Sequence, residues 1–238
     1  MRKDGRGADE LRPMIIERGV FKHAEGSALI KVGDTHVLCS ATVEEKAPPF
    51  MKDKGKGWGT AEYSMLPRAT HTRTQRERKG LNGRAMEIQR LIGRSLRSIV
   101  EPSLLCERTI TVDCDVIQAD GGTRCASITG AYVALSDAVS WLLAKERIAR
   151  SPIKDQVAAV SVGISKGSVF LDLTYEEDSS AEVDMNVVMT GGGLFVEVQG
   201  TAETHPFGAD DMNAMMNVSR AGLLKIFERQ RGVTGPQG

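Results

Sequence analysis

The first half of the chain alternates between apolar and polar positions in stretches typical of β-strands, with one clear helical pattern among them. Two β-branched runs on either side of Gly33-Asp34 predict a hairpin. Apolar residues recur at helical spacing over 84–100 and predict a helix, which Pro102 closes. Residues 1–26 are polar and charged, so we expect an arm or a loop there. The expected elements are strands at 27–32, 35–43, 58–66 and 108–118, and helices at 84–100 and 127–150.

The pattern restarts after Ser151-Pro152 with two further hairpins and a last helix. The expected strands are 156–165, 168–174, 184–190 and 194–199. We expect the helix to begin near Asp210, whose side chain would cap the free N–H groups. It should bury Met212, Met215, Met216, Leu223, Ile226 and Phe227. Residues 231–238 are expected to form a disordered tail.

Both halves therefore read as several strands followed by a helix. This order predicts an α+β fold in which two related modules, about 1–150 and 151–230, pack as one unit. The chain of 238 residues is long enough to bury a substantial core.

Charge is balanced overall but unevenly distributed. Residues 68–97 carry nine Lys or Arg and two acids, whereas residues 172–184 carry six acids and no base. The first segment can hold phosphates, and the second can hold a metal ion or a proton. The N-terminus lacks the apolar stretch of a signal peptide, and no apolar run approaches the roughly 20 residues that span a bilayer. The four cysteines form no C-x-x-C pair, so we expect a cytoplasmic protein with reduced thiols and no zinc site.

Residues 120–124, Asp-Gly-Gly-Thr-Arg, lie between an expected strand and a helix start. Glycines let the backbone approach a ligand closely, and first-turn N–H groups can bind an anion. Thr123 would add a hydroxyl and Arg124 a fork of donors. The alternative is a tight turn with an arginine in solvent.

Arg84 would open the helix 84–100, where a cation opposes the helix dipole. That placement is easier to understand if an anion lies between the arginine and the helix end. The alternative is an arginine folded back onto Glu87 or into solvent.

Asp178 and Asp184 stand out in the acidic segment, flanked by Glu176, Glu177 and Glu182. We expect Asp178 to end one strand and Asp184 to begin the next, so that a hairpin brings the two carboxylates together. Close carboxylates bind a divalent cation or raise one another's pKa until one can donate a proton. The alternative is a solvated acidic loop.

Arg68, Arg73 and Arg76 belong to a polar stretch that is expected to form a mobile loop. Basic side chains without nearby aromatic residues are typical of contacts to a phosphate backbone rather than to bases. A solvated loop or a subunit contact is the alternative.

Taken in order, several segments resemble the bacterial RNase PH family over about residues 1–205. They are Asp4-Gly5-Arg6, Leu11-Arg12-Pro13, 23–27, Met65-Leu66-Pro67-Arg68, 86–92, 113–124 and 184–190. The resemblance implies two βαβ-type modules with left-handed crossovers, like domain 2 of a small-subunit ribosomal protein, packed as one domain over 1–230. It also implies a homohexamer built as a trimer of dimers.

The resemblance also implies roles for the candidate residues. The phosphate site would use Arg84, Gly122, Thr123 and Arg124. Asp178 and Asp184 would be the acidic pair, and Arg68, Arg73 and Arg76 would grip tRNA. The implied activity is phosphate-dependent removal of 3′ nucleotides from tRNA precursors as nucleoside diphosphates, in a reversible reaction.

Mg²⁺ suits the hard oxygens of the acidic pair better than zinc, and Asp184 is a candidate general acid or Mg²⁺ ligand. Two other functions remain open at this point. One is a non-catalytic RNA-binding subunit of an exosome-like ring. The other is a metal-dependent hydrolytic nuclease.

Overall fold

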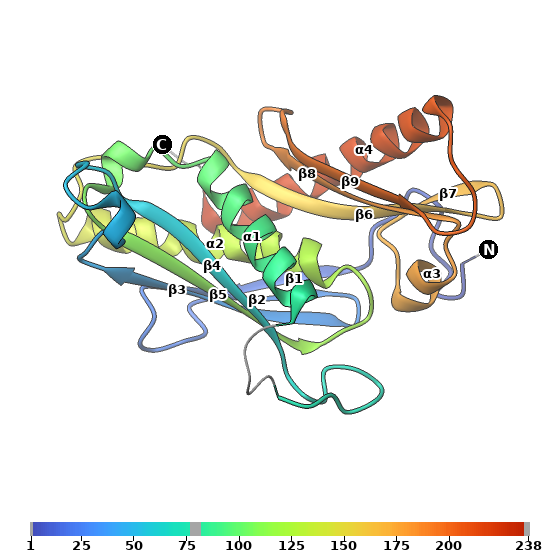
Figure 1. Cartoon of the computed structure of the whole chain (residues 1–238), viewed down its shortest axis with the longest axis horizontal. Coiled ribbons are helices and arrows are strands. Elements are labelled where there is room, and N and C mark those ends of the chain that lie inside the picture. Colours follow the sequence, from blue (N-terminus) through green and yellow to red (C-terminus); the bar gives the residue numbers. More distant parts are fainter. Residues whose placement is uncertain (1, 77–81, 236–238) are drawn as a thin grey trace.

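The computed structural model describes residues 2–76 and 82–235, within which a pair of β-sheets and four helices stack in layers (Figure 1). The first half contains β1 (Met14–Arg18), β2 (Gly26–Val32), β3 (Thr35–Glu44), β4 (Trp58–Met65), α1 (Gly83–Ser98), β5 (Thr109–Gln118) and α2 (Thr123–Ala144), with short 3-10 helices at Pro49–Met51 and Pro102–Leu105. The predicted hairpin is confirmed as β2 and β3, and the predicted strands β4 and β5 and the helix α1 are confirmed within one or two residues at each end.

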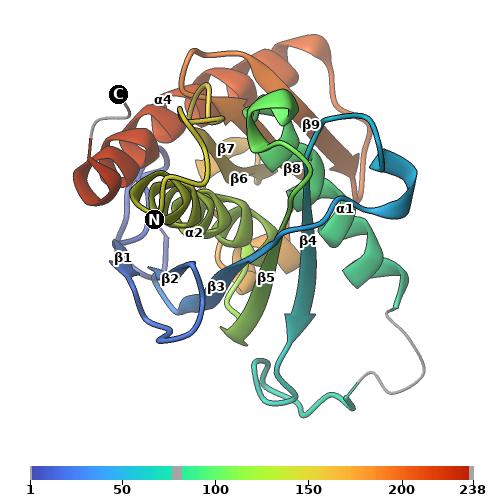
Figure 2. The same ribbon diagram turned by 90° about the vertical axis from the view of Figure 1, so that its left-hand side faces the viewer.

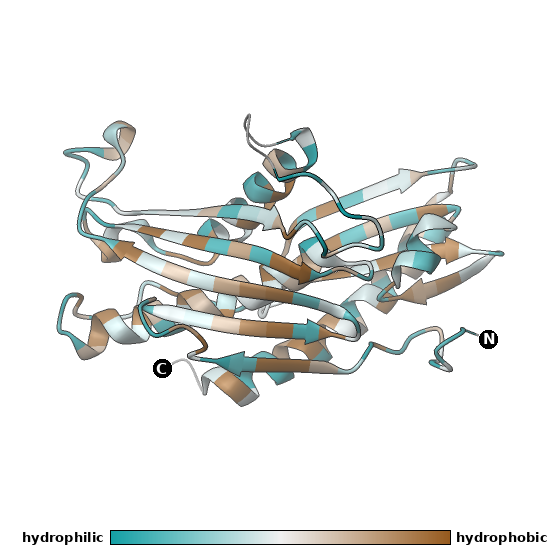
Figure 3. Ribbon diagram, turned by 90° about the horizontal axis from the view of Figure 1, so that it is seen from below, coloured by the Kyte–Doolittle hydropathy of each residue, from teal (hydrophilic) through white to brown (hydrophobic). Residues whose placement is uncertain are grey.

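The first sheet has the strand order β1-β2-β3-β5-β4. Its strands are antiparallel except for β4, which runs parallel to β5 and reaches it through α1. This is the βαβ unit expected for the first module. Side chains alternate across the sheet, so that Ala28, Ile30 and Cys39 are buried under α2 while their neighbours face outward. Figure 3 shows this alternation as hydrophobic and hydrophilic bands along the strands.

The second half contains β6 (Val157–Ser165), β7 (Ser168–Leu171), α3 (Tyr175–Ser179), β8 (Val183–Thr190), β9 (Phe195–Ala202) and α4 (Ala209–Thr234). Its sheet has the order β7-β6-β8-β9 and is antiparallel throughout. β7 and β8 both run opposite to β6, so they share a direction, and α3 links them. The α+β class is confirmed. In the second module, however, only the five-residue helix α3 connects the two strands that share a direction, β7 and β8.

The second sheet lies between two helices, as seen end-on in Figure 2. Val157 and Ala159 of β6 join the core that contains α2, whereas Val160 packs with Met215 and Phe227 of α4. Because β6 is buried on both faces, its sequence is apolar from Val157 to Ile164 apart from Ser161. α2 is long and apolar enough to span a membrane, but 78% of its apolar window is buried, as expected for the core helix between two sheets.

Four sequence expectations about where elements form, begin or end were wrong. Met14–Arg18 is a strand rather than part of a loop, paired with β2 at the sheet edge. α2 begins at Thr123, four residues earlier than expected, and ends at Ala144. β7 ends at Leu171 because Asp172 adopts a left-handed conformation with φ of 54°. α4 continues through Thr234, since the buried Gln230 donates to the carbonyls of Thr129 and Val157, at 3.0 Å each.

The expected start of the last helix also differs in detail. Gly208 is the N-cap residue, and its N–H donates to the carboxylate of Asp211, at 3.0 Å, rather than a cap being formed by Asp210. Met212 is 42% exposed, whereas Met215 is buried as expected. Residues 236–238 of the expected tail lie outside the described residues.

Candidate active site

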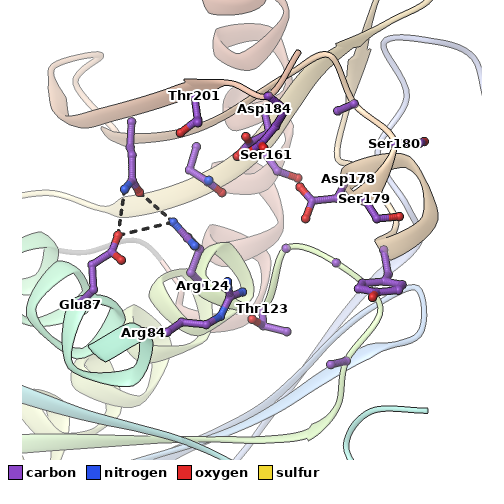
Figure 4. Close-up of a pocket in the computed structure, with 18 of the residues that line it drawn as sticks. Arg84, Glu87, Thr123, Arg124, Ser161, Asp178, Ser179, Ser180, Asp184 and Thr201 are labelled. Atoms are coloured by element: carbon purple, nitrogen blue, oxygen red, sulfur yellow. Dashed lines mark hydrogen bonds and ion pairs between the residues drawn. The ribbon is translucent and has the colours of Figure 1, made fainter. Parts of the chain in front are cut away.

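A cavity of about 740 Å³ opens between the two modules, where α1, α2 and α3 meet one face of the second sheet (Figure 4). All the residues expected at the phosphate site and both acidic residues line it: Arg84, Gly122, Thr123, Arg124, Asp178 and Asp184. The structure therefore brings together groups that lie far apart along the chain.

The turn before α2 requires its two glycines. Gly121 and Gly122 have φ of 75° and 64°, a region that side chains disfavour. A Cβ at Gly121 would lie 2.6 Å from the carbonyl oxygen of Leu173, so the backbone also needs the space. The turn is held in place by Thr35, whose hydroxyl accepts from the Asp120 N–H at 2.9 Å and donates to the Gly121 carbonyl at 2.7 Å.

The first turn of α2 has no side-chain cap on its backbone N–H groups. Gly122 is the N-cap residue and has no side chain to accept from the first-turn N–H groups. The first hydrogen bond within the helix runs from the Ala126 N–H to the Gly122 carbonyl, at 2.9 Å, so the N–H groups before Ala126 have no partner within the helix. The Thr123 hydroxyl lies 2.9 Å from the hydroxyl of Tyr63, which fixes its position. Free N–H groups and the helix dipole both favour negative charge here.

Arg124 is held by a small polar network beside this helix start. Its Nη1 donates to Gln199 Oε1 at 2.7 Å, and Gln199 Nε2 donates to Glu87 Oε1 at 2.8 Å. The Glu87 carboxylate lies 3.9 Å from Arg124 itself. This network spans α1, α2 and β9, so it fixes the guanidinium relative to both modules.

The Arg84 side chain points toward Arg124 and Thr123 (Figure 4). It is exposed, and among residues 2–76 and 82–235 no hydrogen bond or ion pair holds it. The suggested contact with Glu87 is not formed, because Glu87 is engaged by Gln199. Two guanidinium groups that face one space repel each other, and an anion between them would relieve the repulsion.

Asp178 and Asp184 line the same cavity, but the expected hairpin between them was wrong. Asp178 lies on α3 and Asp184 on β8. α3 forms because Thr174 and Glu177 make a capping box at its start. The carboxylates approach each other because the helix turns back over the strand, not because two strands pair.

Burial raises the pKa of both members of this acidic pair. Arg124 and then Arg84 act against that shift in the pKa of Asp178. The pKa of Asp184 is raised further by the negative charges of Asp178 and Glu203. These are the conditions under which a carboxylic acid keeps a proton that it can donate.

The same two carboxylates suit a hard divalent cation. Within the described residues, no group of three or more His, Cys, Asp or Glu side chains is placed to hold a metal ion. Mg²⁺ commonly uses only one or two carboxylates and takes its other ligands from water and substrate phosphates. The residues present therefore fit Mg²⁺ bound together with a phosphate-containing substrate.

Three of the remaining acids, Asp172, Glu176 and Glu177, hold the N-terminal arm rather than a ligand. The buried Arg2 donates to both oxygens of Glu177, at 2.7 and 2.6 Å, and Glu176 pairs with Lys3. Arg12, also buried, donates to Asp172 through Nε at 3.1 Å and Nη2 at 2.7 Å. Sequence reasoning missed these ion pairs. The available signal was that the arm carries several arginines and residues 172–177 carry acids of the opposite charge.

Sequence reasoning also missed the polar residues that the second sheet turns into the cavity. Asn186 pairs with Gln199 and Asp184 with Thr201 across β8 and β9. Side chains two residues apart on a strand share a face, so the spacing of Asp184 and Asn186 was the available signal.

Arg68, Arg73 and Arg76 are exposed on the segment after β4, where no helix or strand forms. We call residues 68–76 the basic segment. Thr70 lines the cavity, so this segment reaches its mouth. Residues 77–81, which belong to the stretch expected to be a mobile loop, lie outside the described residues.

Comparison with known proteins identifies the family of this chain. The sequence model of the 3′ exoribonuclease family matches residues 10–140 with its domain 1 and residues 155–222 with its domain 2. The chain is 59% identical to ribonuclease PH of Moorella thermoacetica over 99% of this chain and 95% of that protein.

Solved structures share the fold. Rrp46 from rice superposes with a TM-score of 0.82 at 20% identity, covering 99% of this chain and 100% of that one. A chain of the Archaeoglobus fulgidus exosome with bound RNA gives 0.82 at 24% identity, covering 96% and 92%. With two family domains matched in order, this chain belongs to the 3′ exoribonuclease family and is similar to its ribonuclease PH members.

Proposed function

We propose that this protein is a phosphate-dependent 3′-to-5′ exoribonuclease that shortens tRNA precursors one nucleotide at a time and releases nucleoside diphosphates. One observation carries the proposal: Arg84, Arg124 and the uncapped start of α2 face one cavity next to two carboxylates. Orthophosphate has the size and charge to bind between the two guanidinium groups. Family membership and 59% identity to a ribonuclease PH support the same activity.

In the proposed reaction, an oxygen of orthophosphate attacks the phosphorus of the last phosphodiester bond. The bond from that phosphorus to the 3′ oxygen of the penultimate nucleotide breaks. The terminal nucleotide leaves as a nucleoside diphosphate, and the shortened RNA keeps a 3′ hydroxyl. The bond formed resembles the bond broken, so the reaction is reversible and also adds nucleotides.

Electrostatics accounts for most of the catalysis. Two anions must meet, and Arg84, Arg124 and the first-turn N–H groups of α2 offset their repulsion. The network from Glu87 through Gln199 keeps Arg124 in place before substrate arrives. Such preorganised donors typically contribute ~10²–10³-fold each to the rate.

The departing 3′ oxygen needs a proton or a cation. The raised pKa of Asp184 suits it to donate a proton, with Asp178 beside it. Alternatively both carboxylates would hold Mg²⁺, which stabilises negative charge on phosphate oxygens when it is bound. In the first of these roles Asp184 acts at the leaving oxygen and not at the attacking phosphate.

The basic segment is proposed to guide the RNA to the cavity. Arg68, Arg73 and Arg76 are exposed and carry no acid pair within residues 2–76 and 82–235. Cations of this kind contact the backbone of tRNA without reading its sequence. We further propose a homohexamer, a trimer of dimers, as the resemblance of the sequence to the RNase PH family implies.

We propose that residues 1–230 form one domain whose modules, about 1–150 and 151–230, share the active cavity. Two matched family domains and the burial of α2 between both sheets support this. A cytoplasmic location fits the four cysteines, all of which are free thiols.

One assay separates this function from its two rivals. The protein is incubated with 3′-extended tRNA and Mg²⁺, with and without phosphate, and the released nucleotide is identified. Phosphate-dependent release of nucleoside diphosphate supports the proposal. Release of monophosphate without phosphate would identify a hydrolase, and RNA binding without release would identify a non-catalytic ring subunit.

A further inference from the structure

Tyr175 is a large aromatic side chain that the reaction described above does not use. It is the first residue of α3, it is 56% exposed, and it lines the active cavity. Its ring centroid lies 6.4 Å from that of His71, with the ring planes inclined at 54°. The two rings come from different modules and meet only in the folded protein.

Tyr175 is exposed on a rigid support. Its backbone N–H donates to Asp120 Oδ1 at 3.2 Å, which ties it to the turn before α2. The capping box of Thr174 and Glu177 fixes the helix start, and the buried Arg2 holds Glu177 in turn. An aromatic ring that is both exposed and held costs little entropy when a ligand stacks on it.

The position of the two rings indicates what binds there. Asp178 follows Tyr175 by one turn of α3 and lines the same cavity. His71 lies in the basic segment, between Arg68 and Arg73. A strand that runs from the basic segment to the acidic pair would therefore pass Tyr175, and its bases would come within reach of the ring.

We propose that Tyr175, with His71 opposite it, forms a stacking site for a nucleobase near the 3′ end of the bound RNA. The proposal rests on the function proposed above and adds a recognition element to it. Every base has a π-face, so this contact tolerates any sequence, as an enzyme that trims successive nucleotides requires. It also revises the view that the basic segment lacks nearby aromatic residues, since the fold supplies one from α3.

Substitution of the ring gives the first test. Tyr175→Ala should weaken binding of a short single-stranded RNA on the order of ten-fold, as base stacking on an aromatic ring predicts. Tyr175→Phe keeps the ring and should restore binding. The slope of log Kd against log salt should stay at the wild-type value, because no phosphate contact is lost. Phe50→Ala removes an equally exposed aromatic ring outside the cavity and is the matched control.

RNA with a single abasic nucleotide gives the second test. The abasic position is moved through the last nucleotides of the strand, and each RNA is measured with wild type and with Tyr175→Ala. At one or two positions, the loss of binding free energy caused by the abasic nucleotide and the loss caused by Tyr175→Ala should not add. The missing base and the missing ring remove the same contact. Additive losses at every position, or a Tyr175→Phe variant as weak as Tyr175→Ala, would overturn the stacking site.

The same preparations keep this inference separate from the proposed function. Wild-type protein must release nucleoside diphosphate from the unmodified RNA only when phosphate is present. If it does not, the exoribonuclease assignment fails whatever Tyr175 does. If it does, and Tyr175→Ala binds every RNA as wild type does, only the stacking site is refuted.

Discussion

Asp172→Asn is the change that most sharply tests how the N-terminal arm supports the site. The Asp172 carboxylate is 5% exposed and accepts from the Arg12 N–H at 2.8 Å, from Nε at 3.1 Å and from Nη2 at 2.7 Å. Asparagine keeps the size of the side chain and tolerates the φ of 54° at this position. The substitution therefore removes the charge and one acceptor while leaving the shape unchanged.

The expected loss in the free energy of unfolding follows from the buried Arg12, which keeps its charge but loses its carboxylate partner. Arg12 is also 5% exposed, and its next nearest carboxylate is that of Asp120, at 3.9 Å. Breaking a buried ion pair by removing one partner costs about 3–5 kcal/mol. Because the asparagine oxygen still accepts one bond, we expect about 3 kcal/mol, at the lower end of that range. For a chain of this size that corresponds to a fall in Tm of roughly 6–12 °C.

Urea unfolding, at one fixed protomer concentration, measures this loss, since assembly changes apparent stability. The control is Glu17→Gln, which breaks the exposed pair with Lys31 and should cost less than about 1 kcal/mol. The phosphate KM should also rise in Asp172→Asn, because Arg12 donates to the Asp120 carbonyl at 2.5 Å and so supports the turn before α2 that is proposed to bind phosphate. If Asp172→Asn unfolds at the same urea concentration as Glu17→Gln, the arm does not hold the site together.

Three further predictions follow from the charges in the cavity. Arg84→Ala or Arg124→Ala should lower the rate of phosphate-dependent trimming by ~10²-fold or more, while RNA binding in a filter assay is retained. An equal loss of RNA binding would show that the substituted arginine contacts the RNA instead. Replacing all three arginines of the basic segment with alanine should reduce the salt slope of RNA binding by about 2, and an unchanged slope would assign the segment to subunit contacts. Asp184→Asn should be inactive yet more stable than wild type at neutral pH in chelator, because the raised pKa of Asp184 means that its charged form destabilises the fold. The gain in stability should vanish as the pH falls below the ordinary pKa of aspartate, where the wild-type carboxyl is protonated in both states. A gain in stability that persists in acid would show that it does not come from the charge of a buried Asp184.

Sequence reasoning worked best where the determinants are local. The hairpin of β2 and β3 follows from Gly33-Asp34 between two β-branched runs. The turn at residues 120–124 was predicted correctly because these residues are contiguous and carry the glycines that positive φ requires. In both cases the chemistry and the backbone constraint occur in one short stretch.

It failed where a side chain is positioned by a distant partner. Asp178 was assigned to a strand end, but a five-residue helix is too short to show a periodicity. That helix is fixed by Arg2, which lies at the other end of the chain. The edge strand β1 was missed for a related reason. Ile15 is 55% exposed, and the strand is positioned by pairing with β2 and by the packing of Met14 and Ile16 against the core, which are distant partners in the sequence.

The convergence of Arg84, Arg124 and the first turn of α2 on one orthophosphate is tested most directly by a crystal structure with arsenate, which has the charge and shape of phosphate and can be located by its anomalous scattering. We expect one arsenate in the cavity, within hydrogen-bond distance of both guanidinium groups and of the Thr123 N–H. An arsenate found elsewhere, with the space between the two arginines filled by protein side chains or by water alone, would contradict it.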